Sequence, residues 1–592
     1  MVHEYQNLRR VYLGIAIGLF IILVARLAYL QIFSWDTYYR ESERNRVRDV
    51  VIEAPRGLLL DRNGEIMVDN RPAYSVSVIP YEFLESQSAT SLLASILNES
   101  SVELVKAVRK EKIGNFSAVK VKRHIDFSVL SSIEEYRLDL PGVFYAVDSK
   151  RYYPAGIRAP HLFGYLSEIT RDELSQVEDR EYRMGDLIGK NGIEIIYEPY
   201  LRGQSGVKYI EVDVLGREVR ELPELAGSSP QSGKNLYMTI DADVQRYLEK
   251  AMEGKRGAAV VLDPSNGEVL AIMSKPDYDP EIFSNPLTPE IWSALINNEE
   301  HPLYNRACQS LYPPGSIYKL VLAAAGLETG LIDLEETVTC YGSYRLGRRQ
   351  FKCWKEKGHG EVNLLDAIQQ SCNVYFYKKG LDVGLANWSK FSRFFRFGSK
   401  TGIDLPNEGS GLVPDAVYFD AKYGVKKWTR GLTLNLAVGQ GELLTTPLQM
   451  AYFAMIVGNE GTAFRPHLVR KIEDPNTGES IEPGRERRQI VGISKSTYRT
   501  IKQGMYLVVN GPHGTGRASW VRGLNVCGKT GTAQNPHGNS HAWFIGFAPK
   551  DNPKIAFCVM VENGGGGGAV AAPIARGILT TYFRDNQLAL GQ

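Results

Sequence analysis

One apolar stretch near the N-terminus, residues 11–33, constrains the architecture more than any other feature of the chain. It carries a single charge, Arg26, and is long enough to cross a bilayer as one helix, which takes about 20 residues. No small-residue cleavage site follows it, so we expect an uncleaved membrane anchor. Arg9 and Arg10 precede the stretch and favour a cytoplasmic tail over residues 1–10. The rest of the chain must then fold as a water-soluble body.

That remainder is long enough to form several domains. A chain of 592 residues predicts about three or four domains, and the 43% of hydrophobic residues can fill their cores. The 69 basic and 67 acidic side chains leave a formal net charge of +2, so the composition gives no indication of nucleic-acid binding. A segment rich in Pro, Gly and Ser, residues 223–234, is typical of a linker.

The chain changes character after this linker. Strand patterns lie at both ends of the C-terminal part, at 257–263 and 268–273 near its start and at 542–548 and 555–561 near its end. Helical patterns lie between these two groups. Such an order predicts an antiparallel sheet covered by helices. Before the linker, strand and turn signals surround a mixed, partly helical segment at about 82–140, which we interpret as a small inserted subdomain. The predicted fold class is therefore α+β.

Ser316 and Lys319 form the most informative local pattern. The turn Pro313-Pro314-Gly315 comes directly before them, and the apolar run 320–327 predicts a buried helix that places both side chains on one face. A hydroxyl is a poor nucleophile until a base takes its proton, and burial lowers the pKa of a lysine so that it can serve as that base. The N-terminus of the helix would also offer backbone N–H groups to an oxyanion.

Two further motifs follow in a fixed order. They are Ser371-Cys372-Asn373 and Lys529-Thr530-Gly531-Thr532. The order S-x-x-K, S-x-N, K-T-G is typical of serine acyltransferases that react with penicillin. The segment 523–530 also satisfies the pattern G-x-x-x-x-G-K-T of a nucleotide-binding loop, which should follow a strand and open a helix. Gly531 and Pro536 disfavour such a helix, so the acyltransferase interpretation is preferred.

On these motifs the chain resembles the class B penicillin-binding proteins. The resemblance extends over nearly the whole chain and includes segments similar to the family's pedestal motifs: Arg56-Gly57, Asp61-Arg62-Asn63-Gly64, Gly189-Lys190-Asn191-Gly192-Ile193-Glu194, Tyr197-Glu198 and Leu201-Arg202-Gly203. Cys353-Trp354 and Gly358-His359-Gly360 resemble penicillin-binding protein 2, the elongation form, with the division-type paralogue as the near alternative. A penicillin sensor and a β-lactamase-like hydrolase are more distant alternatives.

The resemblance implies an architecture of three parts. A transmembrane anchor (11–33) would carry an elongated, mostly β pedestal (34–230) with an inserted head at about 82–140. A transpeptidase domain (235–592) would follow. The implied place is the cytoplasmic (inner) membrane, crossed once, with the bulk of the chain on the periplasmic side. The implied partners are peptidoglycan stem peptides, β-lactams, a SEDS-type glycan polymerase and an elongation scaffold protein.

The resemblance also implies a role for each motif residue. Ser316 would attack a stem peptide and form an acyl-enzyme, and Lys319 would accept its proton. Ser371 would relay a proton to the leaving D-Ala, Asn373 would bind the substrate amide, and Lys529 would be a fixed positive charge. The substrate carboxylate would lie against the segment Thr530, Gly531 and Thr532. No cofactor is implied for this chemistry.

Four residues within the segment 340–372 form a possible metal site. Cys340, Cys353, His359 and Cys372 make up a Cys₃His set, which suits a structural, tetrahedral Zn²⁺. Some penicillin-binding protein 2 relatives resemble this arrangement, and the metal would then hold the S-x-N loop in place. The alternatives are a Cys340–Cys353 disulfide or buried thiols. Cys308, Cys527 and Cys558 are expected to be small core residues.

Overall fold

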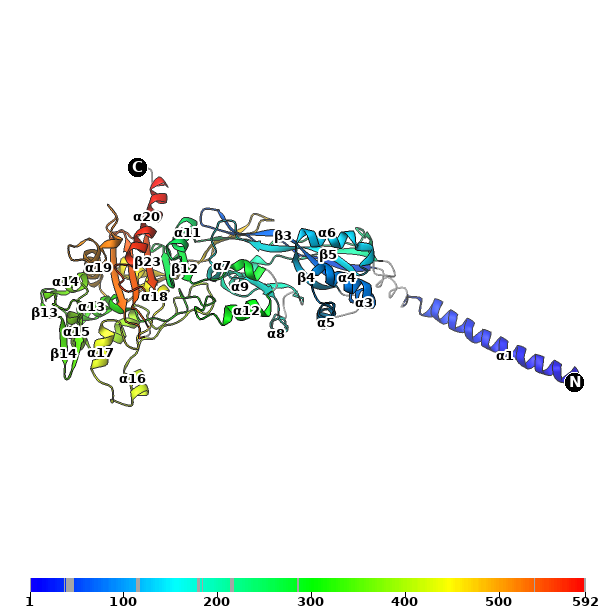
Figure 1. Ribbon diagram of the computed structural model, residues 1–592, viewed down its shortest axis with the longest axis horizontal. Helices are drawn as coiled ribbons and strands as arrows, with labels where there is room; N and C mark the ends of the chain where they lie inside the picture. Colours follow the sequence, from blue (N-terminus) through cyan, green and yellow to red (C-terminus); the bar gives the residue numbers. More distant parts are fainter. Residues whose placement is uncertain are drawn as a thin grey trace. The chain divides into compact units, whose positions relative to one another are not determined.

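The computed structural model describes residues 2–36, 38, 47–112, 118–177, 182–183, 185–212, 218–284, 287–536 and 538–589 (Figure 1). Its contacts divide the chain into two compact units. The small unit contains residues 1–55, 72–149 and 204–231. The large unit contains residues 56–71, 150–203 and 232–592. Strand β3 (Ile66–Val78) belongs to both, because the division falls within it.

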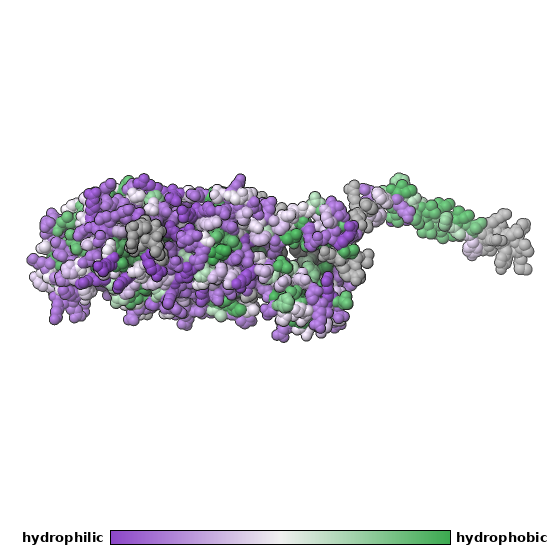
Figure 2. All heavy atoms as spheres, turned by 90° about the horizontal axis from the view of Figure 1, so that it is seen from above, coloured by the Kyte–Doolittle hydropathy of each residue, from purple (hydrophilic) through white to green (hydrophobic). Residues whose placement is uncertain are grey.

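The N-terminal apolar stretch is helical, as expected. Helix α1 (Val2–Ala28) continues into a π-helical turn, η1 (Tyr29–Phe33). Among the described helices, this one is long and apolar enough to cross a membrane, with a mean hydropathy of 2.4 over Val11–Phe33 and no residue of its most apolar window buried. Figure 2 shows the mostly hydrophobic surface of this segment. An exposed apolar surface of this length is stable in a bilayer and not in water.

The small unit combines a three-stranded sheet with a helical subdomain. Its antiparallel sheet has the order β1-β8-β9, and the later half of β3 pairs with β4 in a separate ladder. The helices bury leucines and valines in one apolar core. Leu93 and Leu97 are one helical turn apart on the same helix, and Leu104 comes from the next helix. The bounds are β1 Val47–Ile52, α3 Pro80–Glu85, α4 Gln87–Leu97, α5 Ser101–Glu111, β4 Val119–Ile125, α6 Phe127–Glu135, β5 Val143–Tyr152, β8 Gly206–Val212 and β9 Glu218–Glu221.

The first part of the large unit is built around a buried ion-pair network. Arg56 Nε donates to Glu194 at 2.7 Å and Arg151 Nε donates to the same carboxylate at 2.8 Å, while a second carboxylate, Glu198, also pairs with Arg56. All four side chains are buried. The surrounding elements are β2 Leu59–Leu60, α7 Pro160–Phe163, β6 Leu166–Glu168, α8 Arg171–Gln176, β7 Leu187–Gly189, α9 Gly192–Ile196 and α10 Glu198–Leu201. Arg56, Glu194 and Glu198, from three of the pedestal-like motifs, therefore meet in one cluster, whereas Arg62 pairs with Glu268.

This network belongs to the same contact unit as the C-terminal part of the chain. Residues 56–71 and 150–203 group with 232–592, and strand β2 pairs in parallel with β10 (Asn235–Met238), which in turn pairs with β18 (Val469–Glu473). The predicted pedestal of 34–230 thus contributes residues to both units. Its boundaries, and those of the domain predicted at 235–592, remain predictions.

A five-stranded antiparallel sheet forms the centre of the large unit. Its order is β12-β11-β23-β22-β21, which confirms the predicted sheet of N- and C-terminal strands. Ala258, Val260 and Leu262 share one core cluster with helix α18 (Pro447–Gly458), and Ala259 and Val261 share another with α11 (Ala242–Ala251) and α20 (Ala571–Ala589). The strands are β11 Gly257–Leu262, β12 Val269–Lys275, β21 Cys527–Ala533, β22 His541–Ala548 and β23 Ile555–Val561. Because successive side chains of a strand point to opposite faces, both faces are covered.

The remaining elements surround this sheet. Helix α18 is buried along its whole length, as expected for an apolar helix under a sheet. The other bounds are α11 Ala242–Ala251, η3 Pro280–Ser284, α12 Pro289–Ile296, η4 Gly315–Tyr318, α13 Lys319–Glu328, β13 Val338–Cys340, β14 Ser343–Leu346, β15 Arg349–Lys352, β16 Gly360–Val362, α14 Leu364–Gln369, α15 Asn373–Phe394, α16 Ala416–Tyr423, α17 Gly431–Ala437, β17 Thr462–Phe464, β19 Ser480–Ile481, β20 Arg487–Gln489, α19 Lys495–Asn510, η5 Arg517–Ser519 and α20 Ala571–Ala589.

Candidate active site

Ser316 lies in a tight turn against the edge strand of the sheet. Turn η4 is a 3₁₀ turn and α13 begins at Lys319, so Ser316 comes one turn before the helix expected to contain it. Gly315 has φ 59°, and a Cβ there would come within 2.8 Å of the Thr532 carbonyl oxygen. This close approach requires glycine and brings the backbone of Ser316 beside β21. Ser316 is half-buried, whereas Lys319 is fully buried.

Ser371 lies where a helix ends in a left-handed residue. The N–H of Ser371 donates to Ile368 O at 3.2 Å and that of Cys372 donates to Ala367 O at 2.9 Å. This pair of bonds is the Schellman motif, whose left-handed position is usually occupied by glycine. Ser371 adopts φ 54° there. The chain thus holds a serine at a strained position between α14 and α15, where its hydroxyl reaches the buried lysines.

Two buried amines meet at the Ser371 hydroxyl. Lys319 Nζ lies 3.1 Å and Lys529 Nζ lies 3.0 Å from Ser371 Oγ. Lys319 also donates to Ser371 O at 2.8 Å and to Asn373 Oδ1 at 2.7 Å. The structure therefore brings together four predicted site residues from three distant segments. Within the described residues, the amine of Lys319 forms hydrogen bonds with Ser371 and Asn373, and it forms none with Ser316 Oγ.

Burial changes the charge state of both amines. Burial lowers the pKa of Lys319 to about 8. Burial, followed by the nearby charge of Lys319, holds the pKa of Lys529 well below its usual value. Lys529 was expected to be a fixed positive charge, but its electrostatic neighbour is another cation. The protein groups alone thus favour loss of a proton from this amine.

Asn373 is already engaged by protein groups. Its side-chain oxygen accepts from Lys319, and its Nδ2 donates to Lys352 O at 3.3 Å. Asn373 therefore orients the amine of Lys319. The resemblance implies that Asn373 binds the substrate amide. To do so, its side chain would have to bind the substrate in addition to Lys319 and Lys352 O, or in place of one of them.

The K-T-G segment is a strand along its whole length. Residues 527–533 form β21 and pair with β22, with Lys529 opposite Ile545. A nucleotide-binding loop would place this lysine at the start of a helix, so the nucleotide-binding alternative is wrong. Thr530 is 7% exposed and Thr532 is exposed. The Thr530 hydroxyl lies 2.8 Å from the hydroxyl of Thr515.

Sequence reasoning missed Thr515. It lies between Gly514 and Gly516, just after α19, in a segment interpreted only as a loop. A polar residue between two glycines is the one local signal that could have marked it. Its hydrogen bonds join residues that are far apart in the sequence, and local patterns do not reveal such bonds.

Cys340, Cys353, His359 and Cys372 also meet. Their Sγ and ring-nitrogen atoms all lie within 4.8 Å of one another, and His359 Nδ1 is 3.5 Å from Cys340 Sγ and 3.6 Å from Cys353 Sγ. The neighbouring Cys372 thiol holds the pKa of the Cys353 thiol below its usual value. The three cysteines are free and buried. The other three, at positions 308, 527 and 558, are buried core residues, as predicted.

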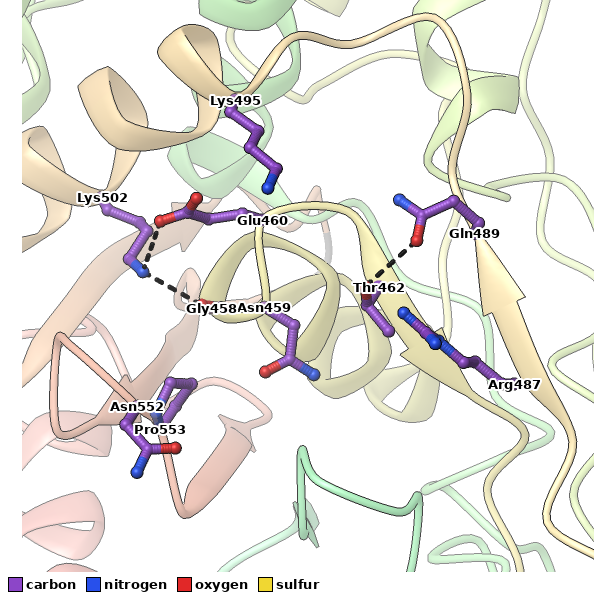
Figure 3. Close-up of a pocket in the computed structure, with 10 residues that line it drawn as sticks. All are labelled: Gly458, Asn459, Glu460, Thr462, Arg487, Gln489, Lys495, Lys502, Asn552 and Pro553. Atoms are coloured by element: carbon purple, nitrogen blue, oxygen red, sulfur yellow. Dashed lines mark hydrogen bonds and ion pairs between the residues drawn. The ribbon is translucent and has the colours of Figure 1, made fainter.

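A cavity of about 380 Å³ lies elsewhere in the large unit (Figure 3). It is polar and none of its lining residues belongs to the predicted site. Lys502 extends from α19 and donates to Gly458 O at 3.1 Å and to Glu460 at 3.2 Å, as the dashed lines in Figure 3 show. This buried cation is therefore already satisfied by protein groups.

Comparison with known families matches both parts of the chain. The model of the penicillin binding protein transpeptidase domain matches residues 257–580. The model of the penicillin-binding protein dimerisation domain matches residues 51–238. The three motifs all lie within the first match.

Individual relatives match over nearly the full length. The chain is 33% identical to the peptidoglycan D,D-transpeptidase MrdA of Escherichia coli K12, over 96% of this chain and 93% of the relative. The penicillin-binding protein PBP2 of Helicobacter pylori, solved in complex with MreC, is 30% identical, with a TM-score of 0.78 over 91% of this chain and 99% of the other. A chain from a peptidoglycan synthase complex is 28% identical, with a TM-score of 0.71 over 98% of both chains. The chain therefore belongs to the class B penicillin-binding proteins, and within them to the PBP2 (MrdA) branch of peptidoglycan D,D-transpeptidases.

Proposed function

We propose that this chain crosslinks peptidoglycan stem peptides through an acyl-enzyme on Ser316, for elongation of the lateral wall. The observation that carries the assignment of residues is the position of Ser371 Oγ, within 3.1 Å of two buried amines. A hydroxyl between two amines of lowered pKa can pass a proton in either direction. The half-buried Ser316 on the neighbouring turn is the accessible nucleophile.

The proposed reaction has two steps. In the first, Lys319 accepts the proton of Ser316, and Ser316 Oγ bonds to the penultimate D-Ala carbonyl carbon. The bond to the terminal D-Ala nitrogen breaks, and Ser371 delivers a proton to that nitrogen. In the second, an amine of a neighbouring stem peptide attacks the ester carbonyl, a peptide bond forms, and Ser316 regains a proton. Backbone N–H groups of Ser316 and Thr532, on adjoining elements, would bind the oxyanion.

β-Lactams would acylate the same serine. Their ring amide takes the place of the D-Ala-D-Ala amide, and their carboxylate would lie against Thr530, Gly531 and Thr532, near Lys529. A β-lactamase or a sensor is disfavoured because the similarity covers 96% of the chain, including the region before the linker.

We propose a single membrane span at residues 11–33, with the tail 1–10 in the cytoplasm and the bulk of the chain outside. The apolar helix supports the span. The likeness to a PBP2 solved with MreC supports an elongation scaffold as partner, and the likeness to a peptidoglycan synthase complex supports a SEDS-type glycan polymerase. No nucleic-acid partner is proposed.

The Cys/His cluster is proposed to hold a structural Zn²⁺. With Zn–S of about 2.3 Å and Zn–N of about 2.0 Å, a tetrahedral site separates sulfur from nitrogen by about 3.5 Å, close to the two observed separations of 3.5 and 3.6 Å. The backbone N–H of Asn373 donates to Cys353 Sγ at 3.4 Å, which suits a thiolate ligand. Because Cys372 follows Ser371 directly, the metal would anchor the strained loop and take no part in the chemistry.

The nucleophile is tested by mass spectrometry of the full-length protein after benzylpenicillin. The adduct should lie on the peptide that contains Ser316, Ser316→Ala should abolish labelling by fluorescent penicillin, and Lys319→Ala should nearly do so. The exposed Ser293→Ala, outside the motifs, serves as the control and should label normally. Labelling that survives Ser316→Ala would refute the assignment.

The metal is tested by metal analysis of the native protein. We expect about one zinc per chain, lost in Cys340→Ser and retained in Cys308→Ser, which removes a buried thiol outside the cluster. A metal-free wild-type protein with a Cys340–Cys353 disulfide would contradict the proposal.

A further inference from the structure

The loop after α19 is packed so tightly around Thr515 that the backbone of this residue has a fixed place. A Cβ at Gly514 would lie 2.2 Å from Val508 O, and one at Gly516 would lie 2.9 Å from the Phe544 ring. The N–H of Gly516 also donates to Val508 O at 2.9 Å. Two glycines are therefore needed for the loop to lie against the last turn of α19, and Thr515 is held between them.

Thr515 joins the segments that carry two of the motifs. Its N–H donates to Gln369 O at 3.4 Å, two residues before Ser371, and its hydroxyl lies 3.5 Å from the same oxygen. The same hydroxyl lies 2.8 Å from Thr530 Oγ1 in the K-T-G strand. The Thr515–Thr530 contact is the shorter and therefore the stronger of the two hydroxyl contacts.

The glycine run 564–568 closes over this pair. A Cβ at Gly568 would lie 2.4 Å from Thr515 O, and one at Gly567 would lie 2.5 Å from Gly531 O. Gly567 also begins the backbone bonds of α20, since its carbonyl accepts from the N–H groups of Ala571 and Ala572. A Cβ at Gly565 or Gly566 would meet no atom within 4 Å, so the tightly packed part of the run is Gly567 and Gly568. Side chains here would push the loop and the K-T-G strand apart.

We propose that Thr515 is a positioning residue for the carboxylate end of the substrate, acting through Thr530. This proposal rests on the proposed function, in which Thr530 contacts that carboxylate. A hydroxyl has one proton, and a carboxylate only accepts hydrogen bonds. When Thr515 donates its proton to Thr530 Oγ1, the proton of Thr530 is free to point at the ligand, and each bond of such a chain strengthens the next.

The ligands concerned are acyl donors with a free carboxylate next to the scissile amide, such as D-Ala-D-Ala peptides and penicillins. A donor whose carboxylate is esterified gains much less from the Thr515–Thr530 chain, because a neutral ester is a weaker acceptor. The chain of hydroxyls therefore makes Thr515 a determinant of specificity for anionic donors.

The test compares acylation of the full-length protein by benzylpenicillin and by its methyl ester. Thr515→Val removes the hydroxyl and keeps the branched shape and the N–H. It should lower the second-order acylation constant for the acid about tenfold, through weaker binding, and change that for the ester by less than about twofold. Thr515→Ser, which keeps the hydroxyl, should restore wild-type selectivity. Thr515→Ala is a second variant that adds no bulk against Gly568 and should behave as Thr515→Val does.

The outcomes separate this proposal from the proposed function. Equal losses for acid and ester in both Thr515→Val and Thr515→Ala would show a merely structural role and overturn the proposal. A Thr530→Val protein that keeps full selectivity for the acid would refute the carboxylate role of Thr530 itself. If Thr515 acts through Thr530, the double variant should lose no more selectivity than Thr530→Val alone.

Discussion

The strained backbone at Ser371 predicts an unusual order of stability for two substitutions. Ser371→Ala and Ser371→Gly both remove the hydroxyl that lies between Lys319 and Lys529. Their difference therefore isolates the backbone, which has φ 54° at this residue. A Cβ in the left-handed region costs about 1–2 kcal/mol, and the greater freedom of glycine in the unfolded chain offsets about 0.4–1 kcal/mol of that. The glycine variant should be more stable than the alanine variant by about 0.5–1 kcal/mol.

A matched pair at an ordinary helical position provides the control. Lys378 is exposed in the interior of α15, where alanine is favoured over glycine by about 1 kcal/mol. Thermal unfolding of the full-length protein in detergent should rank glycine above alanine at position 371 and alanine above glycine at position 378. All four variants should be compared at one protein concentration and one scan rate.

The same two variants separate stability from activity. Both substitutions at 371 should abolish normal transfer, because neither leaves a hydroxyl between the amines, while both substitutions at 378 should label with penicillin as the wild type does. An alanine variant at 371 that unfolds at or above the temperature of the glycine variant would refute the reasoning, because it would show that the left-handed residue costs nothing. If instead the glycine variant is the more stable one, as expected, the chain keeps a serine at a position suited to glycine for the sake of the hydroxyl's chemistry.

Three further predictions follow from buried charges. Acylation by penicillin should accelerate about tenfold per pH unit below pH 8 and level off above it, because only neutral Lys319 can accept the proton and burial places its pKa at about 8; a flat profile between pH 6 and 7 would contradict this. Binding of an anionic acyl donor should raise the lowered pKa of Lys529, so calorimetry of Ser316→Ala in buffers of different ionisation enthalpy should detect proton uptake, and a buffer-independent enthalpy would exclude it. Glu194→Gln should destabilise the fold by about 3–5 kcal/mol, because it leaves two buried arginines under-compensated, whereas Arg220→Gln in an exposed ion pair should leave the unfolding temperature nearly unchanged in the same assay.

The parts of the site that depend on local pattern could be predicted from the sequence. The spacing of Ser316 and Lys319 placed both side chains near the start of one helix, and the structure differs only by a 3₁₀ turn at that start. Short apolar runs at both ends of the C-terminal part predicted the strands of the central sheet. These features depend on neighbours within a few residues, which a sequence displays directly.

The parts that depend on long-range contacts could not. The lowered pKa of Lys529 arises from burial and from Lys319, which lies far away in the sequence. The sequence around Thr515 and the glycine run 564–568 gives no local sign of close packing, because glycines locally mark loops. In the structure the same glycines allow backbone segments to approach within distances that a Cβ would prevent. A glycine in a tightly packed contact and a glycine in a flexible loop look alike in the sequence.

The arrangement of the two lysines is a physical reason to expect that such a site prefers anionic donors. Both amines lie within 3.1 Å of one oxygen, so they are no more than about 6 Å apart. At that separation two full charges repel by roughly 3 kcal/mol with an effective dielectric constant of about 20, which corresponds to about two pKa units. The protein alone therefore disfavours two protonated amines. An incoming carboxylate near Lys529 compensates the charge on that amine, and Lys319 can remain neutral as the base for Ser316. The substrate's own carboxylate thus helps to divide the two lysines into an anion-binding group and a proton acceptor, a division that the surrounding protein charges do not impose by themselves.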